Sequence, residues 1–480
     1  MGAGTAPRRA RGTGGSNVGP GGGTGSGGHD AAASRRRFLG AALLAGGGAA
    51  LAACGSGTTA STSTAAPGVG GQVGLPPNRR APVGSDQVPQ IGHVVVVMME
   101  NHSFDNLLGT LGRGDGFALD TSGRPTATNP DGHGRRVRAF HMPTTCQEDG
   151  HPSNSWNASH AAYDGGTNQG FVTSASGPVA MGYWTAADLP FTAGLARTFP
   201  LADRWFSSTL CQTYPNRRFL MAGTSLGLVD DTFPSQLPPN GTIFDQFNRY
   251  DVSWRNYYSS LPTLGIFLPL LSRTSMSANL AHIDTFYPDC AAGTLPEFSL
   301  VDPDFGTQSQ EDPQDIRPGD AFLSRVVHAV MSGPAWSSTL LVWTYDEGGG
   351  YYDHVPPPVA PVPDGVAPIL KPGDLPGSFG RYGFRVPAGL VSPYARPGHV
   401  SHTVYDHTSV LKLVETKWNL PALTRRDAAA NDLLDMVDLH GSPAFARPPV
   451  LPAPASGGTG VTCHVDPSTI PPPGAVVGSN

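Results

Sequence analysis

The sequence predicts an α/β fold built on a central, largely parallel sheet, and two patterns indicate it. Short, continuous apolar runs are typical of strands covered on both faces, and helical patterns lie between these runs. The first expected strand is residues 91–98, followed by a turn at Ser103 and a short helix. The second is residues 338–345, which ends in an acidic pair.

A third strand is expected over residues 384–391, where Pro387 indicates an edge position or an irregular end. Helices are expected over residues 320–332 and 407–418; in the second of these, apolar side chains recur on one face. The alternation of these elements along the chain is that of an α/β domain.

The composition argues against two classes of protein, polytopic membrane proteins and nucleic-acid binders. The chain has 480 residues, 39% of them hydrophobic, with 62 Gly and 47 Pro. Two segments rich in these residues, 120–180 and 355–380, are expected to be long loops or lids. No run of about 18 apolar residues occurs, which argues against a polytopic membrane protein. A net charge of −6 argues against nucleic-acid binding.

The N-terminal segment has the pattern of an export signal. Arg35 and Arg36 precede a short apolar run that ends at Cys54, which resembles a twin-arginine signal with a lipoprotein box. The alternative is an Arg-rich tail before a buried helix. We expect export by the twin-arginine route, with lipid on Cys54 at the outer face of the cell membrane, or secretion. The expected organisation is a signal (1–53), a flexible tether (54–88), a catalytic domain (89–445) and a Pro/Gly-rich tail (446–480).

Four further cysteines, Cys146, Cys211, Cys290 and Cys463, lack the spacing of a zinc site. In an exported chain they allow two disulfides with three pairings, and the sequence does not choose among these.

Two of the expected strands end in acidic or amide side chains. Glu100 and Asn101 follow the first strand, and Asp346 and Glu347 follow the second. Because ligands of open α/β sheets bind at the carboxyl ends of strands, these residues are candidates for one site. The alternative for Asp346 and Glu347, which precede three glycines, is a solvated turn.

Thr213 lies two residues before Pro215, which suits the first position of a helix. Its hydroxyl could cap that helix. Alternatively it is a nucleophile, activated by a metal ion and placed where a helix N-terminus favours an anion.

Four ordered stretches carry a family resemblance. They are residues 100–105 (ENHSFD), 213–217 (TYPNR), 343–356 (WTYDEGGGYYDHVP) and 405–410 (YDHTSV). They resemble the bacterial phosphoesterase family, which contains phospholipases C and related acid phosphatases, over roughly residues 91–420. The resemblance implies an alkaline-phosphatase-like fold, a three-layer α/β sandwich with a central, mostly parallel sheet.

The resemblance also implies a phosphoric ester hydrolase with a phosphothreonine intermediate, acting on phospholipid head groups. The implied metal ligands are Glu100, Asn101, Thr213, Asp346 and Glu347. Three histidines are expected beside the phosphate: His160, His354 and His407. Three further residues are expected to support the site: Arg217, Asp353 and Asp406. An oxygen-rich shell favours Mg²⁺, Ca²⁺ or Mn²⁺ over Zn²⁺.

The sequence departs from the family pattern at Thr167, Gln169 and Asp312, where the usual residues are Lys, Asp and His. These departures put the head-group contacts in doubt. A sulfatase is disfavoured because Thr213 stands where those enzymes need Cys or Ser. A phosphomonoesterase of the acid phosphatase type remains an alternative, and so does a non-catalytic, ligand-binding surface lipoprotein.

Overall fold

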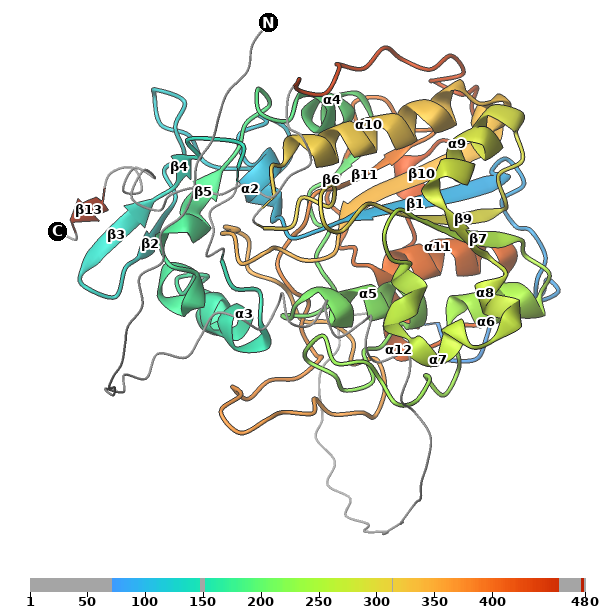
Figure 1. The fold of residues 1–480 in the computed structure, drawn as a ribbon, viewed down its shortest axis with the longest axis horizontal. Helices are drawn as coiled ribbons and strands as arrows, with labels where there is room; N and C mark the ends of the chain where they lie inside the picture. Colours follow the sequence, from blue (N-terminus) through green and yellow to red (C-terminus); the bar gives the residue numbers. More distant parts are fainter. Residues whose placement is uncertain (1–70, 147–151, 313, 457–475, 479–480) are drawn as a thin grey trace, which may run out of the picture. The chain divides into compact units, whose positions relative to one another are not determined.

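The computed structural model describes residues 71–146, 152–312, 314–456 and 476–478. Its central sheet has eight strands in the order β12-β6-β11-β10-β1-β9-β7-β8 (Figure 1). Their bounds are β1 (His93–Met99), β6 (Leu201–Ala202), β7 (Trp254–Tyr258), β8 (Leu280–His282), β9 (Phe298–Asp302), β10 (Thr339–Tyr345), β11 (Ala388–Val391) and β12 (Val400–Ser401). The strands β10, β1, β9, β7 and β8 are parallel to one another.

Helices cover both faces of this sheet, so the domain has three layers. Figure 1 shows α4 (Pro190–Thr198), α9 (Ile283–Ala292) and α10 (Arg317–Ser332) on one face. The other face carries α5 (Thr213–Ala222), α6 (Ile243–Arg249), α11 (Thr408–Trp418) and α12 (Arg425–Ala429). Every residue of β10 is buried, and so is every residue of β1 after His93, as expected for strands between two helical layers.

Smaller elements surround this body. The remaining strands form a sheet of β2 (Thr128–Pro130), β3 (Arg135–Arg138) and β13 (Val476–Gly478), and a pair of β4 (Phe140–His141) with β5 (Gly182–Tyr183). The remaining α-helices are α2 (Phe104–Leu108), α3 (Trp156–Tyr163), α7 (Leu268–Leu271) and α8 (Thr274–Ser277).

The pairing of β1 with β10 determines where the site lies. Met99 pairs with Tyr345 at the ends of the two strands, so the residues that follow them leave the sheet at the same edge. The predicted α/β fold with a mostly parallel sheet is therefore confirmed, and its two acidic strand ends are neighbours.

Two element predictions need correction. The third strand begins only at Ala388, directly after Pro387, and it is internal and antiparallel to β10 and β6 rather than at an edge. A proline has no N–H for the ladder, so the strand starts after it. Helix α5 begins at Thr213 itself, and Pro215 occupies its first turn, where N–H groups have no helical acceptor.

The packed body extends beyond the expected domain limits. Part of the expected tether is hydrogen-bonded to it: the Gly71 N–H donates to the Ala428 carbonyl (3.2 Å), and the Gln87 N–H to the Lys417 carbonyl (2.6 Å). Beyond residue 445, Leu451 is buried. Satisfied backbone groups hold these segments despite their Gly and Pro content.

Among the described cysteines, Cys146 is disulfide-bonded, whereas Cys211 and Cys290 are buried free thiols. Of the pairings that the sequence allowed, those that join Cys211 or Cys290 are therefore excluded. The proposed signal and Cys54 lie outside the described residues. Within the described ranges, every helix is too short or too polar to cross a membrane.

Candidate active site

The backbone at the ends of β1 and β10 forms a small hydrogen-bonded frame. The Asp346 N–H donates to the Met99 carbonyl (3.2 Å), and the carboxylate Oδ1 of Asp346 accepts from the N–H groups of Asn101 (3.1 Å) and Glu347 (2.8 Å). Asn101 has a left-handed backbone, with φ of 67°. A Cβ at Gly349 would lie 2.0 Å from the Asn101 carbonyl oxygen, so this position requires glycine. Asp346 and Glu347 are buried, so the alternative of a solvated turn is wrong.

Arg217 enters this frame from α5. Its Nε donates to Asp346 Oδ2 (3.1 Å), and its guanidinium lies 3.7 Å from Glu100 Oε1 and 3.9 Å from Asp302 Oδ1. All four side chains are at most 2% exposed. Burial lowers the pKa of Arg217, but the three carboxylates outweigh burial and raise it above its usual value. Thr213 precedes Arg217 by four residues, so the two residues share one face of α5.

The cluster around Arg217, which includes Glu100, Asp302, Asp346 and Glu347, contains more acidic than basic side chains. Burial raises the pKa of Glu347 well above its usual range, and the neighbouring Asp346 charge raises it further. Burial also raises the pKa of Asp346 and outweighs the opposing effect of Arg217. In addition, the buried Oδ1 of Asn101 has no hydrogen-bond partner among the described residues. Clustered carboxylates beside an unsatisfied amide oxygen are the donor set that a hard divalent cation prefers, so these residues fit such an ion.

The loop before α5 is fixed by side chains from two other segments. Asn216 accepts from the Thr209 N–H (3.0 Å) and donates to the Cys211 carbonyl (2.8 Å). Arg426 donates to the Ser208 carbonyl (2.7 Å). Thr213 follows this loop as the first residue of α5 and is 9% exposed. Since Gln212 precedes the helix as its N-cap, the alternative of Thr213 as N-cap is wrong.

Three polar residues of this region were missed in the sequence. Asn154 donates to Glu347 Oε1 (2.7 Å), and Asp231 accepts from the Tyr214 N–H (2.9 Å) beside Thr213. Neither residue has a sequence signal that distinguishes it. Asp302 had one, because it ends the apolar strand β9 just as Glu100 follows β1.

Asp353 and His354 belong to a second buried cluster, with Asp105 and Arg385. Arg385 binds Asp353 through Nε (2.8 Å) and Asp105 through Nη2 (3.2 Å). His354 donates to Asp105 Oδ2 (2.7 Å) and lies 3.3 Å from Asp115. Burial lowers the pKa of His354, but the hydrogen bond and charge of Asp105 raise it overall to about 9.

This second cluster also has the geometry of a possible metal site. Ligand atoms of Asp105, Asp353 and His354 all lie within 4.8 Å of one another. However, the Arg385 guanidinium already occupies the space between the two carboxylates. Because the charges here are matched by protein groups, the Glu100 and Asp346 cluster fits a metal ion better.

His407 contacts the candidate site through the backbone of Asp346. It is fully buried; one ring nitrogen, Nε2, donates to the Asp346 carbonyl (2.6 Å), and the other, Nδ1, accepts from Trp205 (3.4 Å). Burial lowers its pKa to about 4, so it is neutral. Its neighbour Asp406 accepts from the hydroxyl of Ser208 (2.8 Å) and so braces the loop before α5. These contacts indicate that both residues position the site.

His160 lies on α3 and is partly buried. Its Nδ1 bonds to the Trp156 carbonyl (2.8 Å), and its Nε2 faces Gly377, where a Cβ would approach to 2.4 Å. Burial lowers its pKa.

Two of the departures from the family pattern lie away from the core: Thr167 is exposed and Gln169 is partly buried. The third, Asp312, is buried and accepts from the Tyr351 hydroxyl (2.9 Å).

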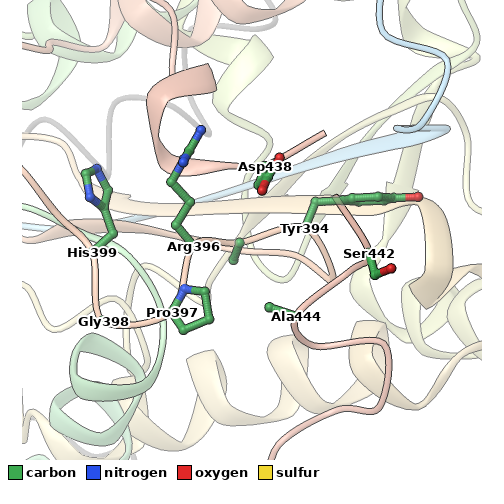
Figure 2. A pocket seen from close by; sticks show the side chains of 9 residues that line it. Tyr394, Arg396, Pro397, Gly398, His399, Asp438, Ser442 and Ala444 are labelled. Atoms are coloured by element: carbon green, nitrogen blue, oxygen red, sulfur yellow. The ribbon is translucent and has the colours of Figure 1, made fainter. Parts of the chain in front are cut away.

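A pocket of about 430 Å³ lies elsewhere, between the end of β11 and the C-terminal region. Figure 2 shows His399 at the left of the view, Arg396 and Asp438 near the top, and Tyr394 and Ser442 at the right. None of the predicted site residues lines it, so we assign it no part in the chemistry.

Comparisons with known proteins agree with this geometry. The Phosphoesterase family model matches residues 91–421. Non-specific phospholipase C6 of Arabidopsis thaliana is 32% identical over 399 residues, covering 75% of this chain and 74% of that protein. Phospholipase C A of Mycobacterium tuberculosis is 30% identical over 415 residues, covering 75% and 79%.

Among solved structures, a protein in the alkaline phosphatase superfamily from Vibrio parahaemolyticus matches with 12% identity and a TM-score of 0.33, covering 68% of this chain and 76% of that one. The assignment rests on the sequence matches, which include the four stretches at the ends of β1 and β10 and at the starts of α5 and α11. The chain belongs to the phosphoesterase family and is a hydrolase that acts on phosphoester bonds.

Proposed function

We propose that the chain is a metal-dependent phospholipase C that cleaves phospholipid head-group esters through a phosphothreonine intermediate. The observation that carries this proposal is the surplus of buried carboxylates at the ends of β1 and β10. Arg217 contacts these carboxylates, and Thr213 lies on the same helix as Arg217. The phospholipase C names of the two relatives support the substrate class.

Glu100, Asn101, Asp346 and Glu347, with the Thr213 oxygen, would hold the divalent ion. The bound ion would neutralise charge on the phosphate and lower the pKa of the Thr213 hydroxyl. Arg217 orients Asp346 through its hydrogen bond and opposes the rise of the Asp346 pKa. The N–H groups of the first turn of α5 have no helical acceptor and favour an anionic phosphate near Thr213.

In the proposed reaction, Thr213 Oγ attacks phosphorus and forms a Thr–O–P bond while the bond from phosphorus to the glycerol oxygen breaks. The departing diacylglycerol oxygen takes a proton, for which the two partly exposed histidines, His160 and His354, are the proposed donors. Water then hydrolyses the phosphothreonine diester, which releases the phosphorylated head group and regenerates Thr213.

The test compares p-nitrophenylphosphorylcholine with p-nitrophenyl phosphate for the wild type, Thr213→Ala and Thr213→Ser. We expect a preference for the diester and a loss of roughly 10³-fold or more in kcat for Thr213→Ala. Thr213→Ser keeps a hydroxyl and is the matched control, with much higher residual activity. Chelation by EDTA should abolish hydrolysis, and added Mg²⁺, Ca²⁺ or Mn²⁺ should restore it.

Each part of the proposal can fail separately. A preference for the monoester would favour the acid phosphatase alternative. Full activity of Thr213→Ala would exclude the nucleophile, and activity after thorough metal removal would exclude the ion. Absence of any hydrolysis by the metal-loaded protein would favour a ligand-binding lipoprotein.

For localisation, we propose twin-arginine export followed by lipid attachment at Cys54, which the pattern around Arg35 and Arg36 supports. Replacing both arginines by Lys should retain the protein in the cytoplasm. Cys54→Ser should move the exported protein from the membrane fraction to the soluble fraction. Unchanged fractionation of both variants would refute this part of the proposal.

A further inference from the structure

The loop between His354 and β11 carries a concentration of exposed apolar side chains. Eleven large hydrophobic residues are exposed in the described part of the chain, and six of them lie within residues 359–375. We call these six the apolar loop patch: Val359, Val362, Val366, Ile369, Leu370 and Leu375. Val359 is 75% exposed and Ile369 57%. In Figure 1 the loop is the orange trace that extends from the body on the side of α5.

Backbone hydrogen bonds hold this loop against the body. The Ala360 N–H donates to the Gly380 carbonyl (2.9 Å), and the Ile369 N–H to the Gly227 carbonyl (2.7 Å). Arg425 donates to the Asp364 carbonyl (2.5 Å). The prolines between these anchors further restrict the backbone. The apolar side chains are therefore presented to solvent by an ordered segment.

The charged groups of the loop have partners of their own. Asp364 accepts from the Thr224 hydroxyl (2.5 Å), and Lys371 pairs with Asp230 (2.5 Å). Asp374 accepts from the Lys371 N–H (2.6 Å). The ion pair and these hydrogen bonds lower the cost of moving the three charged groups out of water.

The apolar loop patch adjoins the segments that hold the candidate active site. Asp230, the partner of Lys371, precedes Asp231, which accepts from the Tyr214 N–H beside Thr213. At the other end of the patch, the Leu375 carbonyl accepts from Trp156 (2.8 Å) on α3. A surface bound to this patch therefore lies close to the residues that we assign to catalysis.

We propose that the apolar loop patch inserts into the outer layer of a phospholipid bilayer and holds the active site at that surface. This inference rests on the proposed function, because it makes the patch the route to a lipid substrate. A lipid surface fits better than a protein partner because all six exposed side chains are aliphatic. Protein interfaces depend instead on Trp, Tyr and Arg anchors.

The test is flotation of the full chain with unilamellar phosphatidylcholine vesicles. All proteins carry Cys54→Ser, which removes lipid attachment, and Thr213→Ala, which keeps the vesicles intact. Val359→Asp and Ile369→Asp are the test variants. Val450→Asp is the matched control, because Val450 is 98% exposed outside the patch. We expect each test variant to weaken vesicle binding by about tenfold or more, and the control to bind as the parent does.

A second measurement separates this inference from the proposed function. With Thr213 present, the test variants should hydrolyse soluble p-nitrophenylphosphorylcholine at the parental rate but vesicle phosphatidylcholine at least about tenfold more slowly. Parental binding by both variants would overturn the inference while leaving the proposed function intact. Failure of all proteins to cleave either substrate would instead refute the function. A self-association that the variants abolish, with no vesicle binding, would identify a second copy as the occupant and overturn the inference.

Discussion

Arg217 and Arg385 are both completely buried arginines that bind aspartates, yet their surroundings differ in charge. Arg217 faces Glu100, Asp302 and Asp346. Arg385 faces Asp105 and Asp353, and the protonated His354 adds a second positive charge there. The Arg385 cluster is therefore nearly neutral, whereas the Arg217 cluster keeps a negative surplus.

The comparison shows that proximity of ligand atoms alone does not identify a metal site. Ligand atoms of Asp105, Asp353 and His354 lie within 4.8 Å of one another, but Arg385 already binds the two carboxylates. Charge that the protein leaves uncompensated, together with the unsatisfied Asn101 oxygen, supports our proposal that the other cluster binds a cation.

The largest expected effect comes from Arg385→Met. This change leaves Asp105 and Asp353 buried without their guanidinium, which should lower the free energy of unfolding by about 3–5 kcal/mol. Urea unfolding with and without EDTA measures it. If this cluster is structural, the loss is the same in both conditions, and a loss that added Mg²⁺ reverses would instead make it a metal site.

Metal removal should have the next largest effect, and at the other cluster. An ion present at about 100 times its Kd stabilises the fold by about 2.7 kcal/mol, so EDTA should lower the Tm of the wild type. Asp346→Asn should reduce this dependence because it removes a ligand. Arg217→Met should lower the Tm of the metal-free protein. Because this change removes a nearby positive charge, it should increase the rise in Tm on adding metal.

Two outcomes would break this part of the comparison. A wild-type Tm that does not respond to EDTA would show that the Arg217 cluster tolerates its surplus charge without an ion. An Asp346→Asn protein that responds like the wild type would place the ion elsewhere.

The smallest effect is the pH dependence from His354. Its pKa in the fold is about 9 against the usual 6.5, so the stability that it contributes is present below about pH 6.5 and is lost as pH rises through 9. Asp105, Asp115, Asp353 and Arg385 face the imidazole. Because the ring is 30% exposed, we expect its protonation to contribute about 1–2 kcal/mol to the free energy of unfolding.

Urea unfolding at pH 7 and pH 10 measures this contribution. The free energy of unfolding should fall more over this interval for the wild type than for His354→Gln. Equal falls would mean that Asp105 does not stabilise the protonated ring.

The sequence predicted the parts of the site that lie at element ends. Glu100 and Asp346 follow buried apolar strands, and Thr213 lies at the start of a helix. The hydrophobic pattern of the sequence was therefore sufficient to place these residues at the ends of elements. A parallel sheet placed both acidic ends at one edge, whereas the pairing of the two strands with each other is known only from the structure.

The remaining contacts depend on tertiary packing that no local pattern records. Asn154 reaches Glu347 across 193 positions of sequence, and Arg385 reaches Asp105 across 280. His407 was expected beside the phosphate, but the fold buries it below Asp346, because the start of α11 packs under the sheet edge. The metal ion, the nucleophile and the export signal stay predictions.

The hydrogen bond between Asn101 and Asp346 joins residues 245 positions apart, and the register of β1 with β10 provides it. Neither half of the chain can therefore assemble the catalytic centre by itself. A nascent chain released before residue 346 would lack two of the proposed cation ligands, so on our proposal the ion binds only after β1 and β10 have paired. If the proposed export route is also confirmed, cation binding would mark the folded state that a twin-arginine route requires of its cargo.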